Sequence, residues 1–379
     1  MLGVLFGTMS MIIVLSIFNG FDDVIKSLYR DVDSDLKIEL NEGVLFNVNE
    51  KLLNDIKEVP GVYDCVEVLE YKMLAQYDDY QSVIDAKGVG INYSNVSNLA
   101  NQVNGFTTNA NNNIFTSTNF VIVGSGVFNA LSLKLLDYEN TLRLSFFADA
   151  KNVLDLNNYI NTRNFYVTEV FHSKVEIDNT HIFLNIEDLR NFLRLPKKCS
   201  SIEISLQKGS SIADVKQGIL DVVGSKFLLK NKSQQRPFVY KMIQTEKLVV
   251  YIIFTFILFI SMISLGATLM ILLMEKQHDI RVLSYLGLGL QNIKLIFLTV
   301  GMLVTITGLC LGSIIGFIIC FLQDSTNFIK LSNQGAFFID AYPVQVNLSD
   351  VLLIQLIVVI LGFLTSYFIT FQNRFYPIS

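Results

Sequence analysis

Charged residues are missing from four long stretches of this 379-residue sequence. Residues 1–21, 248–274, 295–323 and 351–373 contain no Asp, Glu, Lys or Arg, although 17% of the whole chain is charged. With 51% hydrophobic residues and a mean hydropathy of +0.45, the chain is too apolar for an ordinary soluble domain and too charged to lie entirely in a membrane. The apolar residues are therefore segregated from the charged ones.

Each charge-free stretch is long enough to cross a membrane. A helix of about 20 apolar residues spans a hydrocarbon core of about 30 Å, and in lipid every backbone polar group must be bonded internally. The alternative, a buried helix of a soluble core, fits poorly with stretches of this length without charge. We expect four transmembrane helices, at residues 1–21, 245–274, 295–323 and 351–373.

The motifs of the common enzyme classes are also missing. The sequence has no G-x-x-x-x-G-K-[ST] phosphate loop, so the chain cannot hydrolyse ATP through such a loop of its own. It has no G-x-S-x-G, HExxH or CxxC pattern either, and we expect no catalytic residue, metal site or cofactor. A net charge of −5 and a pI of about 5.3 give no support to nucleic-acid binding.

The four cysteines are divided between an aqueous segment, which contains Cys65 and Cys199, and the third apolar stretch, which contains Cys310 and Cys320. Cys65 and Cys199 either form one disulfide in an oxidising compartment or remain two buried thiols.

Most of the charge lies in residues 22–244, which are numerous enough to fold around a core of their own. A polar helix continues from the first span over 22–29, and the Asn-rich stretch 101–113 is expected to be a mobile loop. We expect strands at 35–40, 63–69, 72–76, 81–88, 120–123, 142–147, 164–171, 181–185 and 201–206, and helices at 47–58, 127–135 and 186–195. This mixture predicts an α+β domain inserted between helices 1 and 2.

Positive residues indicate the orientation of the helices. The loop 275–294 carries Lys276, Arg281 and Lys294, and the tail 374–379 begins with Arg374. We therefore expect both to lie in the cytoplasm, and residues 22–244 and 324–350 to lie on the opposite side. Because no basic flank precedes the first span, we expect that this helix begins upstream of residue 1.

The tripeptide Gly124-Ser125-Gly126 superficially resembles a dinucleotide-binding loop. Asn129 stands where that motif requires its third glycine, and no acidic ribose ligand is evident in a following βαβ unit. The pattern predicts an ordinary turn from a strand to a helix.

Glycines recur every fourth residue in the third span, at Gly308, Gly312 and Gly316. A helix face without side chains lets another helix approach closely in lipid. The partner helix can belong to the same subunit or to another, and the sequence does not distinguish the two.

Residues 275–287 have the pattern of a short amphipathic helix between spans two and three. One face is apolar, the other is polar, and Gly287 supplies a helix stop. The apolar positions are Ile280, Leu283 and Leu286, and the polar ones are Glu275, Lys276, Asp279 and Arg281. Such a helix either docks into a partner or lies on the lipid surface. For docking, the pattern predicts Ile280 and Leu283 as buried anchors.

This stretch, continued to Phe297, is similar to the signature "EKxxDIxxLxxLGxxxxxIxxxF" of the FtsX-like ABC permeases. Residues 14–21, VLSIFNGF, resemble the end of the first span in the lipoprotein-releasing (Lol) permeases, and 245–247 lie where that family enters its second span. Residues 163–189 are similar to the Lol pattern "RxFxVxGxF…xxD…xxVxxxD", with Glu169 in place of a glycine. The chain is identified as a member of this family over nearly its whole length.

The resemblance implies a bacterial inner-membrane permease whose large domain lies in the periplasm. It implies partners: an ABC ATPase subunit that binds the ATP, a second permease that is the same chain or a paralogue, lipoprotein cargo, membrane lipid and a periplasmic lipoprotein chaperone. Residues 275–287 would couple the ATPase to the spans. In chaperone-recruiting members a proline-bearing hairpin precedes the "RxFxV" strand; here residues 149–162 contain no proline. The corresponding carrier-binding positions are Asn152, Leu154, Leu156 and Tyr159.

Two other functions fit the same superfamily. One is an export permease for drugs or peptides, and the other is a non-transporting regulator that transmits ATPase motion to a cell-wall hydrolase, although regulators of that type carry a much smaller inserted domain.

Overall fold

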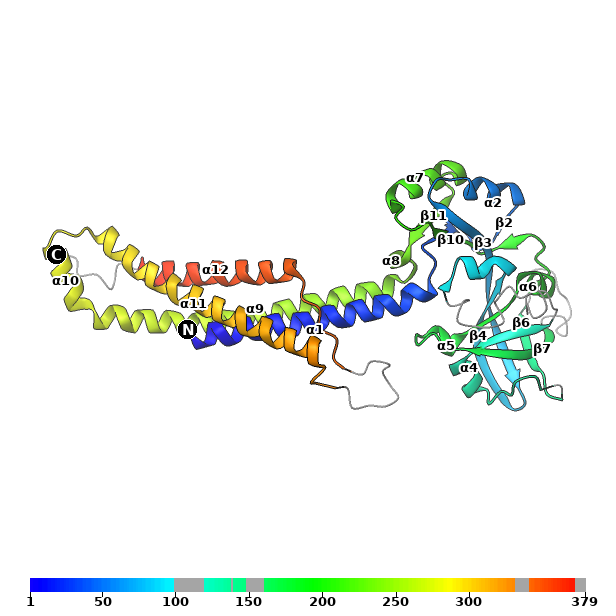
Figure 1. Cartoon of the computed structure of the whole chain (residues 1–379), viewed down its shortest axis with the longest axis horizontal. Helices are drawn as coiled ribbons and strands as arrows, with labels where there is room; N and C mark the ends of the chain where they lie inside the picture. Colours follow the sequence, from blue (N-terminus) through cyan, green and yellow to red (C-terminus); the bar gives the residue numbers. More distant parts are fainter. Residues whose placement is uncertain (99–118, 138, 148–159, 331–340, 372–379) are drawn as a thin grey trace. The chain divides into compact units, whose positions relative to one another are not determined.

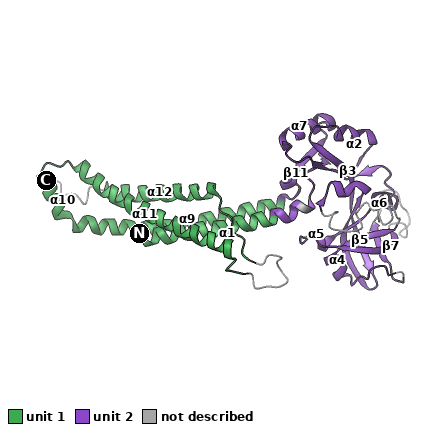
Figure 2. Ribbon diagram, in the orientation of Figure 1, with its two compact units in different colours: residues 1–25, 238–379 green, residues 26–237 purple. Residues whose placement is uncertain are grey.

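The computed structural model describes residues 1–98, 119–137, 139–147, 160–330 and 341–371 (Figure 1). The chain divides into two compact units (Figure 2). The helical unit consists of Met1–Ile25 and Phe238–Ser379, and the domain unit consists of Lys26–Pro237.

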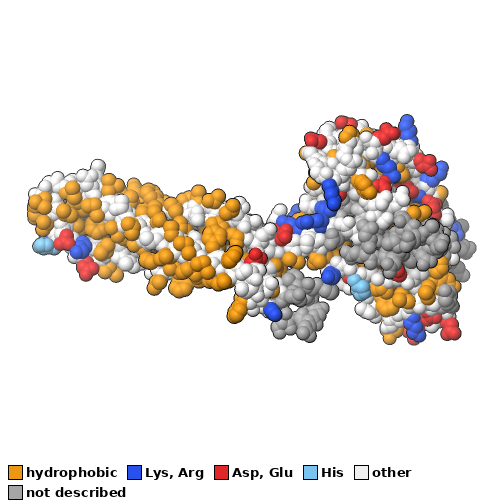
Figure 3. Space-filling model, in the orientation of Figure 1, with side chains coloured by type: hydrophobic (Ala, Val, Ile, Leu, Met, Phe, Trp, Pro, Cys, Tyr) orange, Lys and Arg blue, Asp and Glu red, His pale blue; other side chains and the backbone are white. Residues whose placement is uncertain are grey.

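The helical unit contains the four expected membrane-spanning helices, each long and apolar enough to cross a bilayer. They are α1 (Leu2–Val32), α9 (Pro237–Glu275), α11 (Leu290–Thr326) and α12 (Leu348–Thr370). At 1.5 Å per residue, the 39 residues of α9 extend about 58 Å, well beyond a hydrocarbon core of about 30 Å. Hydrophobic side chains cover much of the visible surface of this unit (Figure 3).

Small residues set the distance between α11 and α12. A Cβ atom added to Gly301 would lie 2.3 Å from Ser366 Oγ, and one added to Gly362 would lie 2.4 Å from Thr305 Cγ2. Each glycine therefore receives a side chain of the facing helix, as is typical of helices that associate in lipid without a hydrophobic driving force.

The domain unit is built on a nine-stranded sheet with the order β11-β1-β10-β3-β4-β8-β5-β7-β6 in its described part. A further pairing of β3 with β6 closes six of these strands into a barrel. Closure is made by β3, which is 16 residues long and pairs with β10, β4 and β6 along its length. The strands are β1 (Leu36–Leu40), β3 (Val62–Tyr77), β4 (Tyr80–Val89), β5 (Phe120–Gly124), β6 (Leu142–Phe147), β7 (Ile160–Phe171), β8 (His181–Asn185), β10 (Ser201–Leu206) and β11 (Phe227–Asn231).

Short helices and a second, two-stranded sheet complete the domain unit. The barrel encloses one apolar core, and a separate core lies where β1, β10 and β11 pack against α2 and α7. Cys65 and Cys199 both lie in this second core as free, buried thiols, so no disulfide joins them. The remaining elements are β2 (Phe46–Asn47), α2 (Glu50–Lys57), η1 (Ile91–Asn95), α4 (Ser125–Ala130), α5 (Ile177–Thr180), α6 (Ile186–Leu193), β9 (Lys198–Cys199), α7 (Ile212–Val223) and α8 (Lys232–Gln235).

The α+β class and the order of the predicted elements up to β10 are as the sequence predicts, but other details differ. The expected strands 63–69 and 72–76 are one continuous strand, β3, because two neighbouring strands hydrogen-bond along adjoining parts of it. Helix α7 and strand β11 were not predicted, and neither were the short elements β2, η1, α5, β9 and α8. The expected loop at 101–113 lies outside the described residues.

Candidate functional site

A short helix, α10 (Gln277–Tyr285), connects the spanning helices α9 and α11. At its start Lys276 Nζ lies 3.0 Å from Asp279 Oδ2, and both side chains are exposed. At its end the Gly287 N–H donates to the Ser284 carbonyl at 3.0 Å, and the Leu288 N–H donates to the Leu283 carbonyl at 3.1 Å. These are the two bonds of a Schellman motif, in which the φ of +92° at Gly287 is the left-handed position.

Ile280 turns into the chain's own interior. Its side chain is 1% exposed and lies in a small core with Leu273 of α9 and with Ile293 and Phe297 of α11. The prediction that Ile280 is an anchor buried in a partner is therefore wrong, because the two helices that flank α10 already cover it. Ile280 instead fixes α10 to the ends of both spanning helices.

The apolar side chains that α10 leaves exposed lie toward its last turn. Tyr285 is 85% and Leu286 is 79% exposed, and Val282 and Leu283 are partly uncovered. Glu275, Lys276, Asp279 and Arg281 are exposed as well. An exposed apolar group bordered by charge is typical of a surface that contacts a partner or a membrane. The prediction of α10 as a contact helix is retained, with Tyr285 and Leu286 in place of Ile280.

At a second site, polar side chains join three spanning helices. We call this group of side chains the Asp350 cluster. Lys247 Nζ of α9 lies 2.8 Å from Asp350 Oδ2 of α12 and donates to Asn19 Oδ1 of α1 at 2.9 Å. Asn19 Nδ2 donates to Asp350 Oδ2 at 2.7 Å, and the Tyr251 hydroxyl donates to Asp350 Oδ1 at 2.8 Å. Asp350 also stands in the first turn of α12, where the helix dipole favours a negative charge.

Sequence reasoning did not identify the Asp350 cluster. A signal was present, because Lys247 and Asp350 are the charged residues immediately before the charge-free stretches 248–274 and 351–373. Ionisable groups at the border of the hydrocarbon region are costly unless they are paired, so two such residues of opposite sign are candidates for one another. The role of Asn19 could not be read in this way, because an amide in an apolar stretch has many alternative partners.

The three glycines of α11 contact α1 of the same chain. A Cβ atom added to Gly312 would lie 1.9 Å from Thr8 Oγ1, and one added to Gly308 or Gly316 would lie within 3.4 Å of Val4 or Ile12. Of the two partners that the sequence left open, the structure thus places a helix of the same subunit against this ridge.

Two further sequence features have no role in a described site. Gly124 and Gly126 stand at the turn from β5 to α4, where a Cβ on Gly124 would be 2.2 Å from the Asp178 backbone oxygen. The close approach of α5 explains these glycines without a nucleotide. The carrier-binding positions Asn152, Leu154, Leu156 and Tyr159 lie outside the described residues.

An inserted α+β domain after the first of four spanning helices, with a short connecting helix between the second and third, defines a class of membrane permease. Residues 1–222 match the MacB-like periplasmic core domain and residues 251–378 match the FtsX-like permease C-terminal region. The chain belongs to the family of FtsX-like ABC permeases with a MacB-like periplasmic core domain.

Within that family, similar curated proteins are subunits of one system. The chain is 26% identical to the lipoprotein-releasing system transmembrane protein LolC of Buchnera aphidicola subsp. Schizaphis graminum, over 100% of this chain and 88% of the relative. It is 21% identical to the corresponding protein LolE of Haemophilus influenzae, over 97% of this chain and 89% of the relative. Among solved structures, the periplasmic region of MacB from Actinobacillus actinomycetemcomitans is 10% identical, with a TM-score of 0.39, over 56% of this chain and 95% of that chain.

Proposed function

We propose that this chain is the permease subunit of an ABC-type complex that releases outer-membrane lipoproteins from the bacterial inner membrane to a periplasmic carrier. The observation that carries the proposal is the alignment with lipoprotein-releasing relatives across the whole chain, the spanning helices and the inserted domain together. A likeness confined to the helices would support an ABC permease of any cargo.

The structure supports α10 as the place where a separate ATPase subunit acts. The helix presents Tyr285 and Leu286 to a partner while Ile280 holds it against α9 and α11. A displacement of α10 by the ATPase would therefore be passed to two spanning helices at once. This is the coupling that an ATP-driven transporter needs, since a ligand bound to one protein can shift another only through a contact that differs between two states.

The proposed orientation follows from charge. Lys276 precedes α10, Arg281 lies in it and Lys294 follows it. The preference of basic residues for the cytoplasm supports that side for α10. The domain unit is attached at the opposite end of α9 and lies in the periplasm, where a carrier would receive the cargo. The second permease subunit is either another copy of this chain or a paralogue.

The proposal is tested by reconstitution. Proteoliposomes containing this chain, its ATPase, its partner permease and a lipid-modified reporter protein are incubated with ATP and a soluble periplasmic carrier. We expect the reporter to move into the soluble fraction with ATP, and to stay in the membrane when the phosphate-loop lysine of the ATPase is replaced.

A reporter without its lipid modification is the matched control, and it should not depend on the complex. Retention of the lipid-modified reporter together with ATP-driven export of a drug or a peptide would assign the chain to the alternative transport function.

A further inference from the structure

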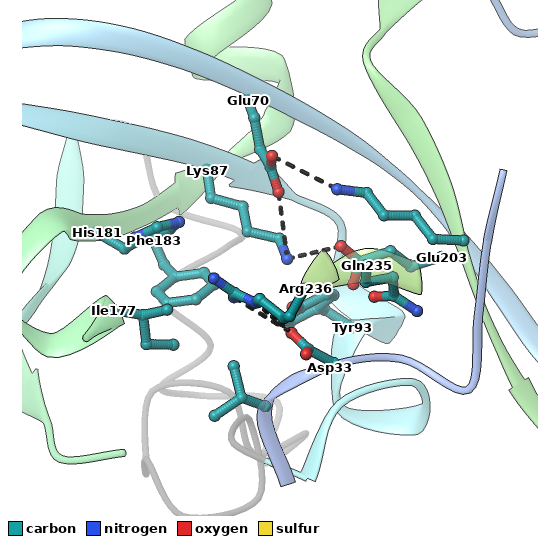
Figure 4. Close-up of a pocket in the computed structure, with 12 residues that line it drawn as sticks. Asp33, Glu70, Lys87, Tyr93, Ile177, His181, Phe183, Glu203, Gln235 and Arg236 are labelled. Atoms are coloured by element: carbon teal, nitrogen blue, oxygen red, sulfur yellow. Dashed lines mark hydrogen bonds and ion pairs between the residues drawn. The ribbon is translucent and has the colours of Figure 1, made fainter. Parts of the chain in front are cut away.

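The domain unit contains a cavity of about 180 Å³ that borders a row of charges on adjacent strands (Figure 4). Lys37 of β1 stands opposite Glu203 of β10, and Glu70 of β3 stands opposite Lys87 of β4. Side chains in such cross-strand positions lie on one face of the sheet and interact directly. One wall of the cavity is thus a ladder of two cross-strand pairs, each of opposite charge.

The charges of this ladder satisfy one another. Lys87 Nζ lies 2.6 Å from Glu203 Oε1 and 3.5 Å from Glu70 Oε1, and Lys37 Nζ lies 3.6 Å from Glu70 Oε2. Although burial favours the neutral acid, Lys37 and Lys87 lower the pKa of Glu70 to about 2. Burial opposes the charge of Lys87 as well, but Glu203 raises the pKa of Lys87 above its ordinary value. Both lysines are therefore engaged with carboxylates and do not offer a site for an anion.

Two carboxylate oxygens on the cavity wall are buried without a hydrogen-bond partner among the described residues. They are Glu203 Oε2 and Asp33 Oδ2. The Glu203 side chain is 3% exposed and the Asp33 side chain 7%, and the other oxygen of each is occupied, by Lys87 and by Arg236. An ionised carboxylate only accepts hydrogen bonds, and a buried acceptor that receives no hydrogen bond costs free energy. Each of the two oxygens therefore lacks a hydrogen-bond donor that a molecule in the cavity could supply.

We propose that this cavity is a binding site for a small organic cation that carries N–H donors, a primary ammonium or a guanidinium group. The two residues that carry the unpaired oxygens line the cavity. The rings of Tyr93 and Phe183 line it too, and the Lys87 ammonium already lies over them, 5.2 Å and 5.9 Å from their centroids. In the described part of the chain no three metal-ligating side chains come together, so a coordinated metal ion fits less well. The volume accommodates several non-hydrogen atoms, since one water occupies about 30 Å³ of liquid.

The site would also be connected to the two segments that enter and leave the domain unit. Asp33 follows α1, and Arg236 precedes α9. Arg236 Nη2 lies 3.2 Å from Asp33 Oδ1, and Gln235 Nε2 donates to the Ser34 carbonyl at 2.9 Å. A cation bound at Asp33 Oδ2 would therefore add a contact to these two interactions, which hold the entering and leaving segments together.

The test uses the full chain in detergent with a single fluorescent reporter. The chain contains no tryptophan, so Gln235→Trp places one indole at the cavity wall. Putrescine is titrated at constant ionic strength, and tetramethylammonium serves as a comparison cation that has no N–H donor. We expect a saturable change in tryptophan emission with putrescine and none with tetramethylammonium.

Replacing Glu203 by Gln in the reporter chain should weaken putrescine binding at least tenfold, because it removes the charge that the cation meets. Asp33→Asn is a second, independent variant with the same expected direction. Asp188→Asn is the control, since Asp188 is a buried carboxylate of the same domain that does not line the cavity, and it should leave the titration unchanged.

Thermal unfolding of the chain without substitutions provides a second measurement that no variant can confound. Putrescine should raise the unfolding temperature by a few degrees once it is in large excess over its dissociation constant. A flat titration together with an unchanged unfolding temperature would overturn the proposal and leave a water-filled cavity. An equal response to tetramethylammonium would also overturn it, because N–H donors would then not be required for binding.

Discussion

Buried and half-buried ion pairs occur in both units, and three of them join residues that are far apart in the sequence. Lys87 and Glu203 are 116 positions apart, Lys247 and Asp350 are 103, and Asp33 and Arg236 are 203. Such pairs add little to net stability compared with apolar residues of the same size, but removing one partner costs about 3–5 kcal/mol. Their effect is therefore to fix which segments meet.

His181 predicts a pH dependence of the domain unit. Burial and Lys87 lower the pKa of His181 to about 4, from an ordinary value of 6.5. Because the unfolded chain then binds the proton more tightly, the stability due to neutral His181 is complete above pH 6.5 and is lost as the pH falls toward 4. The charged residues that act on it are Lys87, Glu70, Asp85 and Arg236.

We expect His181→Gln to remove most of this acid dependence, at most about 3 kcal/mol between pH 7 and pH 4. Urea unfolding of the full chain, followed at several pH values in that window, measures it. His172→Gln is the control, since that side chain is exposed on the same domain. An identical slope for the chain with and without His181 would show that this histidine does not titrate on unfolding.

At the scale of elements, α1 and α11 form a close-packed pair of the helical unit, and α10 is its proposed contact surface. Thr8 Oγ1 donates to the Val4 carbonyl at 2.9 Å, so the hydroxyl that sits over Gly312 is satisfied within its own helix. At Gly312 the two helices are therefore in contact through shape and not through a hydrogen bond of Thr8. Any side chain larger than hydrogen at Gly312 meets Thr8 directly.

Replacing Gly312 and Gly316 together by Leu should separate α1 from α11 and destabilise the chain by about 3 kcal/mol or more. Detergent-solubilised yield and thermal unfolding measure the effect. Gly289→Ala is the control, because a Cβ atom at Gly289 meets nothing within 4 Å. Normal assembly of the double variant on a native gel would contradict the observed packing.

Leu286→Asp and Ile280→Asp should have different consequences. Leu286 is exposed and would lose only contact with the ATPase, so we expect binding to weaken about 30-fold while the unfolding temperature of the chain is unchanged. Ile280 is buried in the chain itself, so Ile280→Asp should lower the unfolding temperature even without the ATPase.

Co-purification of the ATPase and thermal unfolding of the isolated chain distinguish these outcomes. Lys276→Ala is the control and should barely change binding, because an exposed charge contributes little. If Leu286→Asp retains the ATPase in full, α10 lies on lipid and the docking surface is elsewhere.

At the scale of the whole molecule, the helical unit leaves much of its apolar surface uncovered. In the most apolar 18-residue stretch of each helix, only 17% is buried in α9 and 22% in α12, compared with 44% in α1. Apolar surface of this extent requires lipid or further spanning helices around it. A second permease subunit would cover part of α9 or α12 rather than α1, which the chain itself covers to a greater extent.

The isolated chain should not hydrolyse ATP, because it has no phosphate loop. Hydrolysis is expected only after a separate nucleotide-binding subunit is added. A coupled assay of released phosphate, in detergent and then in nanodiscs, checks both statements, and a chain carrying Leu286→Asp serves as the comparison. Turnover by the purified chain alone would refute the assignment of ATP hydrolysis to a partner.

The candidate site could be predicted only in part from the sequence. The amphipathic pattern located α10 to within a few residues, and Gly287 marked its end, because a left-handed residue after an apolar turn is a local signal. The pattern could not show which apolar residue would be covered, since Ile280 and Leu286 look alike until α9 and α11 are placed beside them.

By itself the sequence determined the four spanning helices, the α+β class of the inserted domain and the absence of a phosphate loop. Each of these depends on hydrophobicity or residue spacing within a short stretch of sequence, so it does not require knowledge of how distant segments pack. Only the tertiary structure decided that Thr8 covers Gly312, that Asp350 holds Lys247 and Asn19, that β3 closes a barrel with β6, and that Asp33 and Glu203 share a cavity. These arrangements bring together residues that are often a hundred or more positions apart, and their energies depend on distance in space rather than along the chain.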